Sequence, residues 1–321
     1  MPAKKVRLII RMGSHAEKDY LEKTIRFLDG VIIGANLLEA APGATASLMV
    51  KFGGEKLLTP LYIDPMTYAF GLYVDPTTGR NRTDLEWIKS DQKKQGKMIR
   101  AFKRSYKALA TKLGPPFEDA LARGRAVSPK DFVDQSKTTK TCESVINYQL
   151  TRISSEFAKD PEFEEYSQHV PKPAAVFAPY FYIVPQSSKE WTDTNLRLAR
   201  TTAALDSSVS VHVVICADVS FLMDRNFLDD LRRDLPRTGA KAVWLWFSKF
   251  YEDSATSNQL KSYRSLIEDL SKNLEVYSMH GGYLSLAFCN FGLTGVSHGV
   301  GYGEQKDVVP VIGQSTPTVR Y

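Results

Sequence analysis

The sequence predicts an α/β fold built as a (β/α)8 barrel, and three observations lead to that prediction. Eight short apolar runs are separated by helical segments, and most of the runs do not alternate with polar residues, which is typical of parallel strands covered on both faces. Eight units favour a closed barrel over the alternative, an open doubly wound sheet, because GANLLEAAPG after the first run is not a glycine-rich dinucleotide turn. The runs are 31–36, 60–64, 175–183, 211–217, 242–248, 276–279, 295–298 and 309–313.

Composition agrees with one large barrel domain over residues 1–321. The chain is 43% hydrophobic and 24% charged, as in ordinary globular proteins. Its three cysteines are scattered and odd in number, which argues against a disulfide framework, so a reducing, cytoplasmic compartment is expected. The cysteines also lack metal-binding spacing, and neither a metal nor a cofactor is expected. No basic-then-apolar leader and no apolar run of about 18 residues is present, so neither secretion nor a membrane span is expected.

The N-terminal part gives the first units of the predicted barrel. Residues 4–11 form a strand or a short apolar edge and are not counted among the eight runs. A helix is expected over 14–28, with Ser14 as its N-cap and Glu17 at capping-box spacing. The run 31–36, a helix at 44–52 and the run 60–64 follow.

A long helical insertion, about 76–172, separates the second and third predicted strands. Helices are expected at 83–95, 97–112 and 141–158, and no buried strand is evident between them. After Pro173 the chain returns to a regular strand–helix rhythm. Its helices are expected at 192–205, 220–235, 257–273 and 283–291.

The carboxyl ends of barrel strands carry the functional residues of such folds, which singles out two aspartates. Asp64 ends the run 60–64 and Asp218 ends the run 211–217. Each is a candidate general base, acid or nucleophile. The structural alternative for Asp64 is a turn before Pro65, and for Asp218 the N-cap of the next helix.

Two histidines, His280 and His298, follow neighbouring strands and lie beside glycine. They are candidates for proton transfer or substrate contact, and the alternative is a histidine that supports a rim loop. His212 lies inside a strand and is expected in the core.

The last loops are rich in glycine, which lets backbone N–H groups approach an anion. Phosphate binding is predicted there, although the same glycines also suit tight turns. The candidates are Gly299, Gly301, Gly303, Gln314 and Ser315. The predicted substrate pocket comprises Asn36, Tyr180, Tyr182, Tyr302 and Glu304, while Trp244 and Trp246 share one face that points either to the pocket or to the helices.

Positive charge is concentrated in the insertion, where residues 80–113 carry eleven Lys or Arg against three acidic residues. A solvated helix face is one explanation, and a surface for a phosphate backbone or an acidic protein is the other. The predicted nucleic-acid contacts are Lys93, Lys94, Lys97, Arg100, Lys103, Arg104 and Lys107.

A barrel with a helical insertion, a basic face and Asp64 followed by an aromatic (DPMTYAF, 64–70) resembles the tRNA-guanine transglycosylase superfamily, including its relatives that insert deazaguanine into DNA. The resemblance implies base exchange with Asp64 as the nucleophile and tRNA or DNA as the partner. The chain departs from the family pattern at Ser297-His298-Gly299, where the second catalytic aspartate is missing, and it has no CxCxxC zinc motif.

Together these features predict a barrel enzyme that binds a nucleotide or a base within nucleic acid, with glycosyl- or ribosyl-transferase-like chemistry. The alternative is a non-catalytic barrel that binds nucleic acid or an acidic protein as a subunit of a complex or a homo-oligomer. A third reading is an enzyme for a small phosphorylated substrate.

Overall fold

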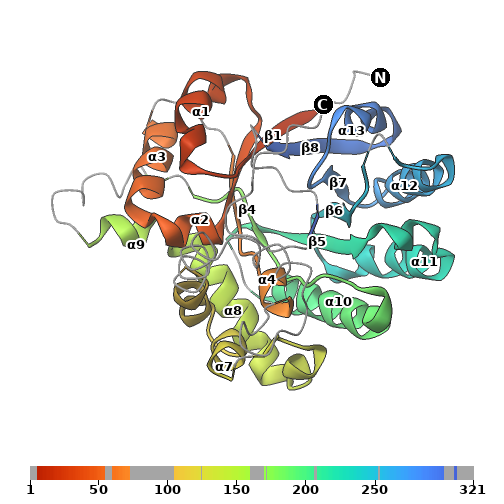
Figure 1. The fold of residues 1–321 in the computed structure, drawn as a ribbon, viewed down its shortest axis with the longest axis horizontal. Coiled ribbons are helices and arrows are strands. Elements are labelled where there is room, and N and C mark those ends of the chain that lie inside the picture. Colours follow the sequence, from red (N-terminus) through yellow and green to blue (C-terminus); the bar gives the residue numbers. More distant parts are fainter. Residues whose placement is uncertain are drawn as a thin grey trace, which may run out of the picture.

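Eight parallel strands form one sheet at the centre of the computed structural model (Figure 1). The structure describes residues 6–54, 60–72, 105–123, 125–159, 170, 172–205, 208–251, 254–299 and 307–308. The strands are β1 (Arg7–Met12), β2 (Gly30–Gly34), β3 (Leu61–Asp64), β4 (Ala175–Phe177), β5 (Ser210–Asp218), β6 (Ala242–Ser248), β7 (Glu275–Ser278) and β8 (Leu293–Gly299).

The order of the strands is that of a (β/α)8 barrel. The sheet runs β3-β2-β1-β8-β7-β6-β5-β4, and its two ends meet where Leu61 pairs with Pro173 just before β4. The Ala174 N–H donates to the Leu61 carbonyl at 2.8 Å across this join. The predicted barrel is therefore confirmed, and the open sheet is excluded.

The predicted numbering of the strands is wrong by one at the start. Residues 7–12 are the full barrel strand β1, and the helical insertion therefore follows the third strand, not the second. Arg7 and Arg11 point into the barrel and are paired with acidic groups there, so β1 lacks the apolar pattern of its neighbours. The predicted eighth run, 309–313, lies outside the described residues, and β8 is the run expected at 295–298.

Helices cover the outside of the sheet (Figure 1). They include α1 (Lys18–Thr24), α2 (Ala35–Ala40), α3 (Pro42–Gly54), α10 (Ser188–Ala204), α11 (Arg225–Asp234), α12 (Ser257–Leu270) and α13 (Tyr283–Phe288). The helix expected at 14–28 is instead α1 between two 3₁₀ turns, and the Ser14 side chain makes no cap. Glu17 accepts from the Gly13 N–H at 2.8 Å, outside the helix.

The short helix α4 (Tyr68–Gly71) follows β3 and precedes the insertion. The described part of the insertion contains a helix at 105–113, α7 (Phe117–Ala122), α8 (Gln135–Thr151) and α9 (Ser154–Phe157). Phe117 and Phe132 pack on Phe181, with ring centroids 6.3 and 5.2 Å away. The Val127 N–H donates to the Phe70 carbonyl at 2.9 Å. The helix predicted at 83–95 lies outside the described residues.

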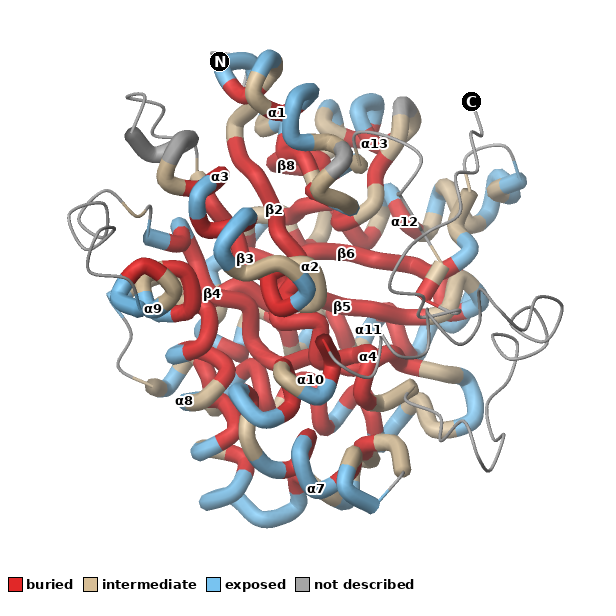
Figure 2. Tube along the Cα trace, turned by 60° about the vertical axis from the view of Figure 1, so that its left-hand side comes forward, coloured by how far each residue is buried: buried red, intermediate tan, exposed pale blue. Residues whose placement is uncertain are grey.

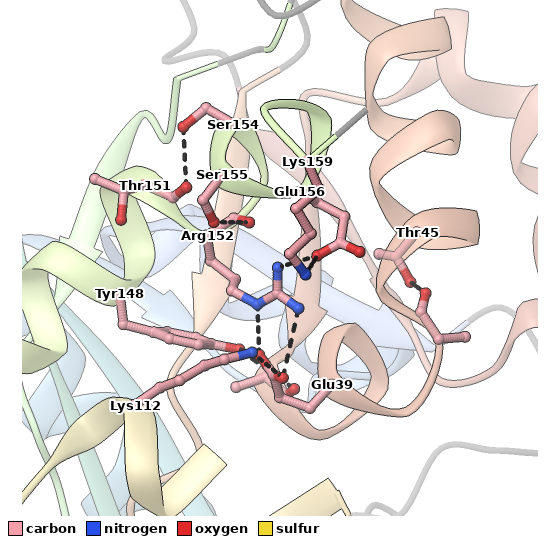
Figure 3. A network of polar contacts seen from close by, with 12 residues as sticks. Glu39, Thr45, Lys112, Tyr148, Thr151, Arg152, Ser154, Ser155, Glu156 and Lys159 are labelled. Atoms are coloured by element: carbon pink, nitrogen blue, oxygen red, sulfur yellow. Dashed lines mark hydrogen bonds and ion pairs between the residues drawn. The ribbon is translucent and has the colours of Figure 1, made fainter. Parts of the chain in front are cut away.

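A buried carboxylate joins this insertion to α2. Glu39 is 8% exposed, and its carboxylate accepts from Arg152 Nε at 2.6 Å, from Tyr148 Oη at 2.9 Å and from the Lys112 ammonium (Figure 3). The Arg152 guanidinium also donates to Glu156 at 2.7 Å. Burial alone would raise the pKa of Glu39, but Arg152 and Lys112 hold it below its ordinary value.

Side chains fill the barrel interior. Figure 2 shows the strands at the centre of the molecule coloured as buried. At the amino end of the barrel Trp244 stacks on Tyr277 at 4.4 Å and donates from Nε1 to His212 Nδ1 at 3.1 Å. His212 is thus a bonded core histidine, as predicted. Trp246, two residues after Trp244, also faces inward and meets Tyr68, so both tryptophans point into the barrel and not to the helices around it.

Candidate functional site at the carboxyl end of the barrel

Asp64 is the most enclosed charged group at the carboxyl end of the described strands. Its side chain is fully buried and both carboxylate oxygens are occupied. Oδ2 accepts from Arg11 Nη2 at 2.7 Å, and Oδ1 accepts from Tyr180 Oη at 2.8 Å and from the Met66 N–H at 2.9 Å. The last contact is the turn that the sequence offers as the structural alternative, so Asp64 shapes the backbone and also orients the Arg11 and Tyr180 side chains.

Arg11 reaches Asp64 from β1, across the barrel interior. Burial alone would lower the pKa of Arg11, but the Asp64 carboxylate raises it, so the guanidinium stays charged. Its Nη1 atom is buried and has no hydrogen-bond partner among the described residues. A buried N–H donor without an acceptor is costly, and it marks a place where a ligand atom can accept a hydrogen bond.

Aromatic rings surround this ion pair. Tyr68, on α4, stacks on Tyr180 with centroids 5.6 Å apart and meets Trp246 edge-on at 5.0 Å. Trp246 in turn lies 4.4 Å from the His280 ring. The faces and edges of such rings suit a flat heterocycle better than an aliphatic chain.

The backbone at the end of β3 is held in an uncommon conformation. Met66 has a φ of 52°, in the left-handed region that side chains other than glycine rarely adopt. Its sulfur lies over Gly34, where an added Cβ would come within 2.9 Å of it. Such local strain is found preferentially at functional sites.

Burial keeps the neighbouring hydroxyl and thiol protonated. It raises the pKa of Tyr180 and of Cys216, and the nearby Asp64 charge adds to the effect in both. Tyr106, from the helix at 105–113, is 1% exposed, and burial and the same carboxylate raise its pKa as well. These groups can donate hydrogen bonds near pH 7 but cannot act there as anionic nucleophiles.

Asp218 sits at a second polar position on the same rim. Its Oδ1 accepts from the Ser220 N–H at 3.0 Å and so caps the short 3₁₀ helix Val219–Met223, while Oδ2 accepts from Tyr182 Oη at 3.1 Å. Burial would raise the pKa of Asp218, but the Ser220 N–H and the Tyr182 hydroxyl lower it. Asp218 is therefore a carboxylate near pH 7, and the cap expected as its structural role is present.

The two predicted histidines have different surroundings. His280 packs on the inward-facing Trp246. His298 pairs in register with Ile10, whereas its neighbour Gly299 pairs with Arg11, so His298 projects to the face opposite Arg11. His298 Nδ1 lies 2.9 Å from the Gly281 carbonyl, which can only accept, so Nδ1 carries the proton.

The remaining pocket and phosphate candidates are placed only in part. Asn36 is half-buried at the start of α2, with its amide oxygen beside Gly34, and Gly299 ends β8. Asp307 accepts from the Lys249 N–H at 3.0 Å, which brings the segment after β8 to the end of β6. The candidates Gly301, Tyr302, Gly303, Glu304, Gln314 and Ser315 lie outside the described residues.

Of the basic candidates, the structure describes Lys107, which is exposed on the helix at 105–113. Tyr106, Leu109 and Ala110 on the same helix are buried. Lys93, Lys94, Lys97, Arg100, Lys103 and Arg104 lie outside the described residues.

Sequence reasoning missed Arg11, the residue that ties β1 to Asp64. The available signal was a basic residue at an odd position of the run RLIIRM, where alternation places Arg7, Ile9 and Arg11 on one face. Ile9 is fully buried, so Arg11 on the same face also points into the barrel. A buried arginine requires an acidic partner there.

Within the described ranges no helix is long and apolar enough to cross a membrane, and no cluster of three or more His, Cys, Asp or Glu side chains is placed to hold a metal ion. Comparison with known proteins adds no family to this picture: no family model matches the chain, and no curated protein is significantly similar to it.

Proposed function

We propose that the chain is a barrel enzyme that binds a nucleobase or nucleotide at the carboxyl end of its strands. The observation that carries the proposal is the Asp64–Arg11–Tyr180 cluster beside the rings of Tyr68 and Trp246. It places buried aromatic rings beside a buried donor, Arg11 Nη1, which has no acceptor among the described residues. A heterocycle with an acceptor atom on its edge matches both features.

In this proposal Asp64 keeps Arg11 and Tyr180 in place and is the carboxylate available for chemistry. Glycosyl or ribosyl transfer with Asp64 as nucleophile requires one of its three hydrogen bonds to open, because both oxygens are occupied. The Tyr180 hydroxyl is the partner that can move to the ligand without unpairing a charge. Tyr180 therefore also supplies a donor to the reacting group.

The test is binding of the free bases and of the corresponding nucleoside monophosphates, measured by calorimetry on the wild-type chain, Arg11→Met and Tyr180→Phe. Wild-type binding that weakens by roughly tenfold or more in each variant supports the proposal, since a lost hydrogen bond to a buried partner costs about 1–3 kcal/mol. Phe27→Ala, on an exposed side chain beside α1, is the control that leaves binding unchanged. Equal binding by all variants contradicts the proposal.

A second candidate function, a non-catalytic nucleic-acid-binding barrel, is favoured by the excess of basic residues in 80–113 and by the exposure of Lys107. Contacts with phosphates release counterions, so binding of single-stranded and duplex oligonucleotides would fall steeply with salt. Replacing Lys97, Arg100, Arg104 and Lys107 by alanine should abolish most of this salt dependence. Lys189→Ala, on an exposed lysine of α10, is the matched control. Binding that is unaffected by the four replacements rules out this face as the contact surface.

A further inference from the structure

The continuation of β4 contains one more residue than the strand beside it. Phe177 pairs with His212 and Ile183 pairs with Ala217, so six steps along one strand match five along the other. Such a bulge changes which side chains face each side of a sheet. Phe177 faces the barrel interior, and after the bulge the inward positions pass to Tyr180 and Tyr182.

Side chains take over the backbone hydrogen bonds that a neighbouring strand would otherwise make here. Each of three residues binds both the N–H and the carbonyl of one residue in this stretch. Gln149 holds Phe177 at 2.8 Å in both bonds, and Asn195 holds Phe181 at 2.9 and 2.8 Å. Thr67 Oγ1 donates to the Tyr180 carbonyl at 2.7 Å and accepts from the Tyr180 N–H at 2.8 Å.

The Thr67 contact differs from the other two in what it positions. Phe181 faces the helices, where it stacks on Trp191 at 4.6 Å, and Phe177 lies in the packed amino half of the barrel. Tyr180 alone of the three places its side chain on Asp64, at 2.8 Å. Thr67 is fully buried and lies three residues after Asp64, so one short loop holds both ends of this hydrogen bond.

We infer that Thr67 is a positioning residue, which sets the Tyr180 hydroxyl on Asp64 and thereby prepares the donor that the ligand meets. The inference rests on the proposed function for its purpose, but the positioning itself is a property of the free protein. A threonine hydroxyl that both donates and accepts can fix a peptide unit in two directions, which neither valine nor alanine can do.

The experiment places 3-fluorotyrosine at position 180 of the full chain and records its fluorine resonance in the wild type, Thr67→Val, Thr67→Ser and Gln149→Met. Thr67→Val and Gln149→Met each remove two backbone hydrogen bonds with little change of shape, so they are matched in structural cost. The expected result is a shifted or doubled resonance in Thr67→Val, its return in Thr67→Ser, and an unchanged resonance in Gln149→Met. If Thr67→Val does not fold, Thr67→Ala replaces it.

An unchanged resonance in the variant without the hydroxyl, or an equal shift in Gln149→Met, overturns the inference. Calorimetry with the same bases and nucleoside monophosphates separates it from the proposed function. Wild-type binding that weakens roughly tenfold to a hundredfold in Thr67→Val, but not in Gln149→Met, supports both. If Thr67→Val binds as tightly as the wild type, the inference alone is overturned. If the wild type binds none of these compounds, the proposed function is overturned, and the fluorine resonance still decides whether Thr67 positions Tyr180.

Discussion

At the scale of single residues, Asp64 and Arg11 are coupled. Replacing either residue leaves the other buried without its charged partner. In Asp64→Asn the amide oxygen can still accept from Tyr180 and from the Met66 N–H, but the amide nitrogen then faces a guanidinium that also only donates. Arg11 is 13% exposed, so water does not replace the lost carboxylate.

We therefore expect Asp64→Asn to lower the free energy of unfolding by about 3–5 kcal/mol, the usual cost of breaking a buried ion pair. Asp229→Asn, on a carboxylate that is 68% exposed and pairs with Arg232, should cost less than about 1 kcal/mol. Urea denaturation measures both. The double replacement Arg11→Met with Asp64→Asn should recover part of the loss, and a double variant less stable than Asp64→Asn would contradict this account.

Lys249 provides a test in which a replacement should raise stability, because the backbone conformation of this residue is unfavourable. Its φ of 67° lies in the left-handed region, where glycine is favoured by about 1 kcal/mol over other residues. Lys249→Gly should raise the free energy of unfolding by about 1 kcal/mol, since the Lys249 N–H can still donate to Asp307. Lys241→Gly, at the other end of β6 and without a positive φ, should lower it. Thermal melts that shift in the same direction for both variants would contradict the prediction.

At the scale of elements, the insertion is attached to the barrel by a buried charge cluster and not by apolar packing alone. Glu39 collects Arg152, Tyr148 and Lys112, which come from α8 and from the helix at 105–113 (Figure 3). Removing the one acceptor leaves Arg152, 5% exposed, without its main partner. The consequence should be local, because the donors all belong to the insertion.

Glu39→Gln is accordingly expected to lower stability by about 3 kcal/mol and to speed hydrogen exchange of the amides in α8 and α9. Amides of β5 and β6, which lie outside this contact, should keep their protection. Glu268→Gln, which breaks an exposed pair with Arg264 on α12, is the control and should change neither measurement appreciably. Faster exchange spread evenly over the whole barrel would show that Glu39 stabilises the fold as a unit.

The arrangement of the elements also explains why only part of the candidate site could be predicted from the sequence. The positions of Asp64, Asp218 and Tyr180 follow from the rule that functional residues stand at the carboxyl ends of barrel strands. The bulge after Phe177 follows from no local sequence signal, because it depends on Gln149, Thr67 and Asn195, which lie far apart in the chain. The role of Arg11 could not be predicted for a related reason. A charged residue inside a barrel is stable only when another strand supplies a partner of opposite charge, here Asp64.

At the scale of the whole molecule, the number of strand–helix units predicted the barrel, although residues 7–12 were not counted as its first strand. The regular alternation of strand and helix after Pro173 alone gives β4 to β8, which is most of a barrel. The error fell on β1, whose inward face carries arginines. The run 309–313 lies outside the described residues, so its predicted strand is not tested. Fold class depends on many weak signals added together, whereas the identity of a single strand depends on the few residues that form it.

The last prediction concerns how the stability of the whole barrel depends on pH. His212 lies between the interior rings, beside Glu275, Lys241 and Arg7, and burial lowers its pKa to about 4. An unfolded histidine titrates near pH 6.5, so between about pH 6.5 and 4 the unfolded chain binds a proton that the folded chain does not. Stability should therefore fall as the pH falls through this window, by at most about 1.4 kcal/mol per pH unit from this group.

His212→Asn separates this contribution from that of the paired carboxylates. The asparagine oxygen can accept from Trp244 Nε1 in place of Nδ1, and it does not titrate. Urea denaturation from pH 7.5 to 3 should then show a shallower loss of stability between about pH 6.5 and 4 than in the wild type. The loss below that should persist in both, because Glu39, Asp218 and Glu275 have lowered pKa values and lose their stabilising charge as the pH falls further. Parallel curves for the two proteins over the whole range would mean that His212 does not set the upper part of the acid response.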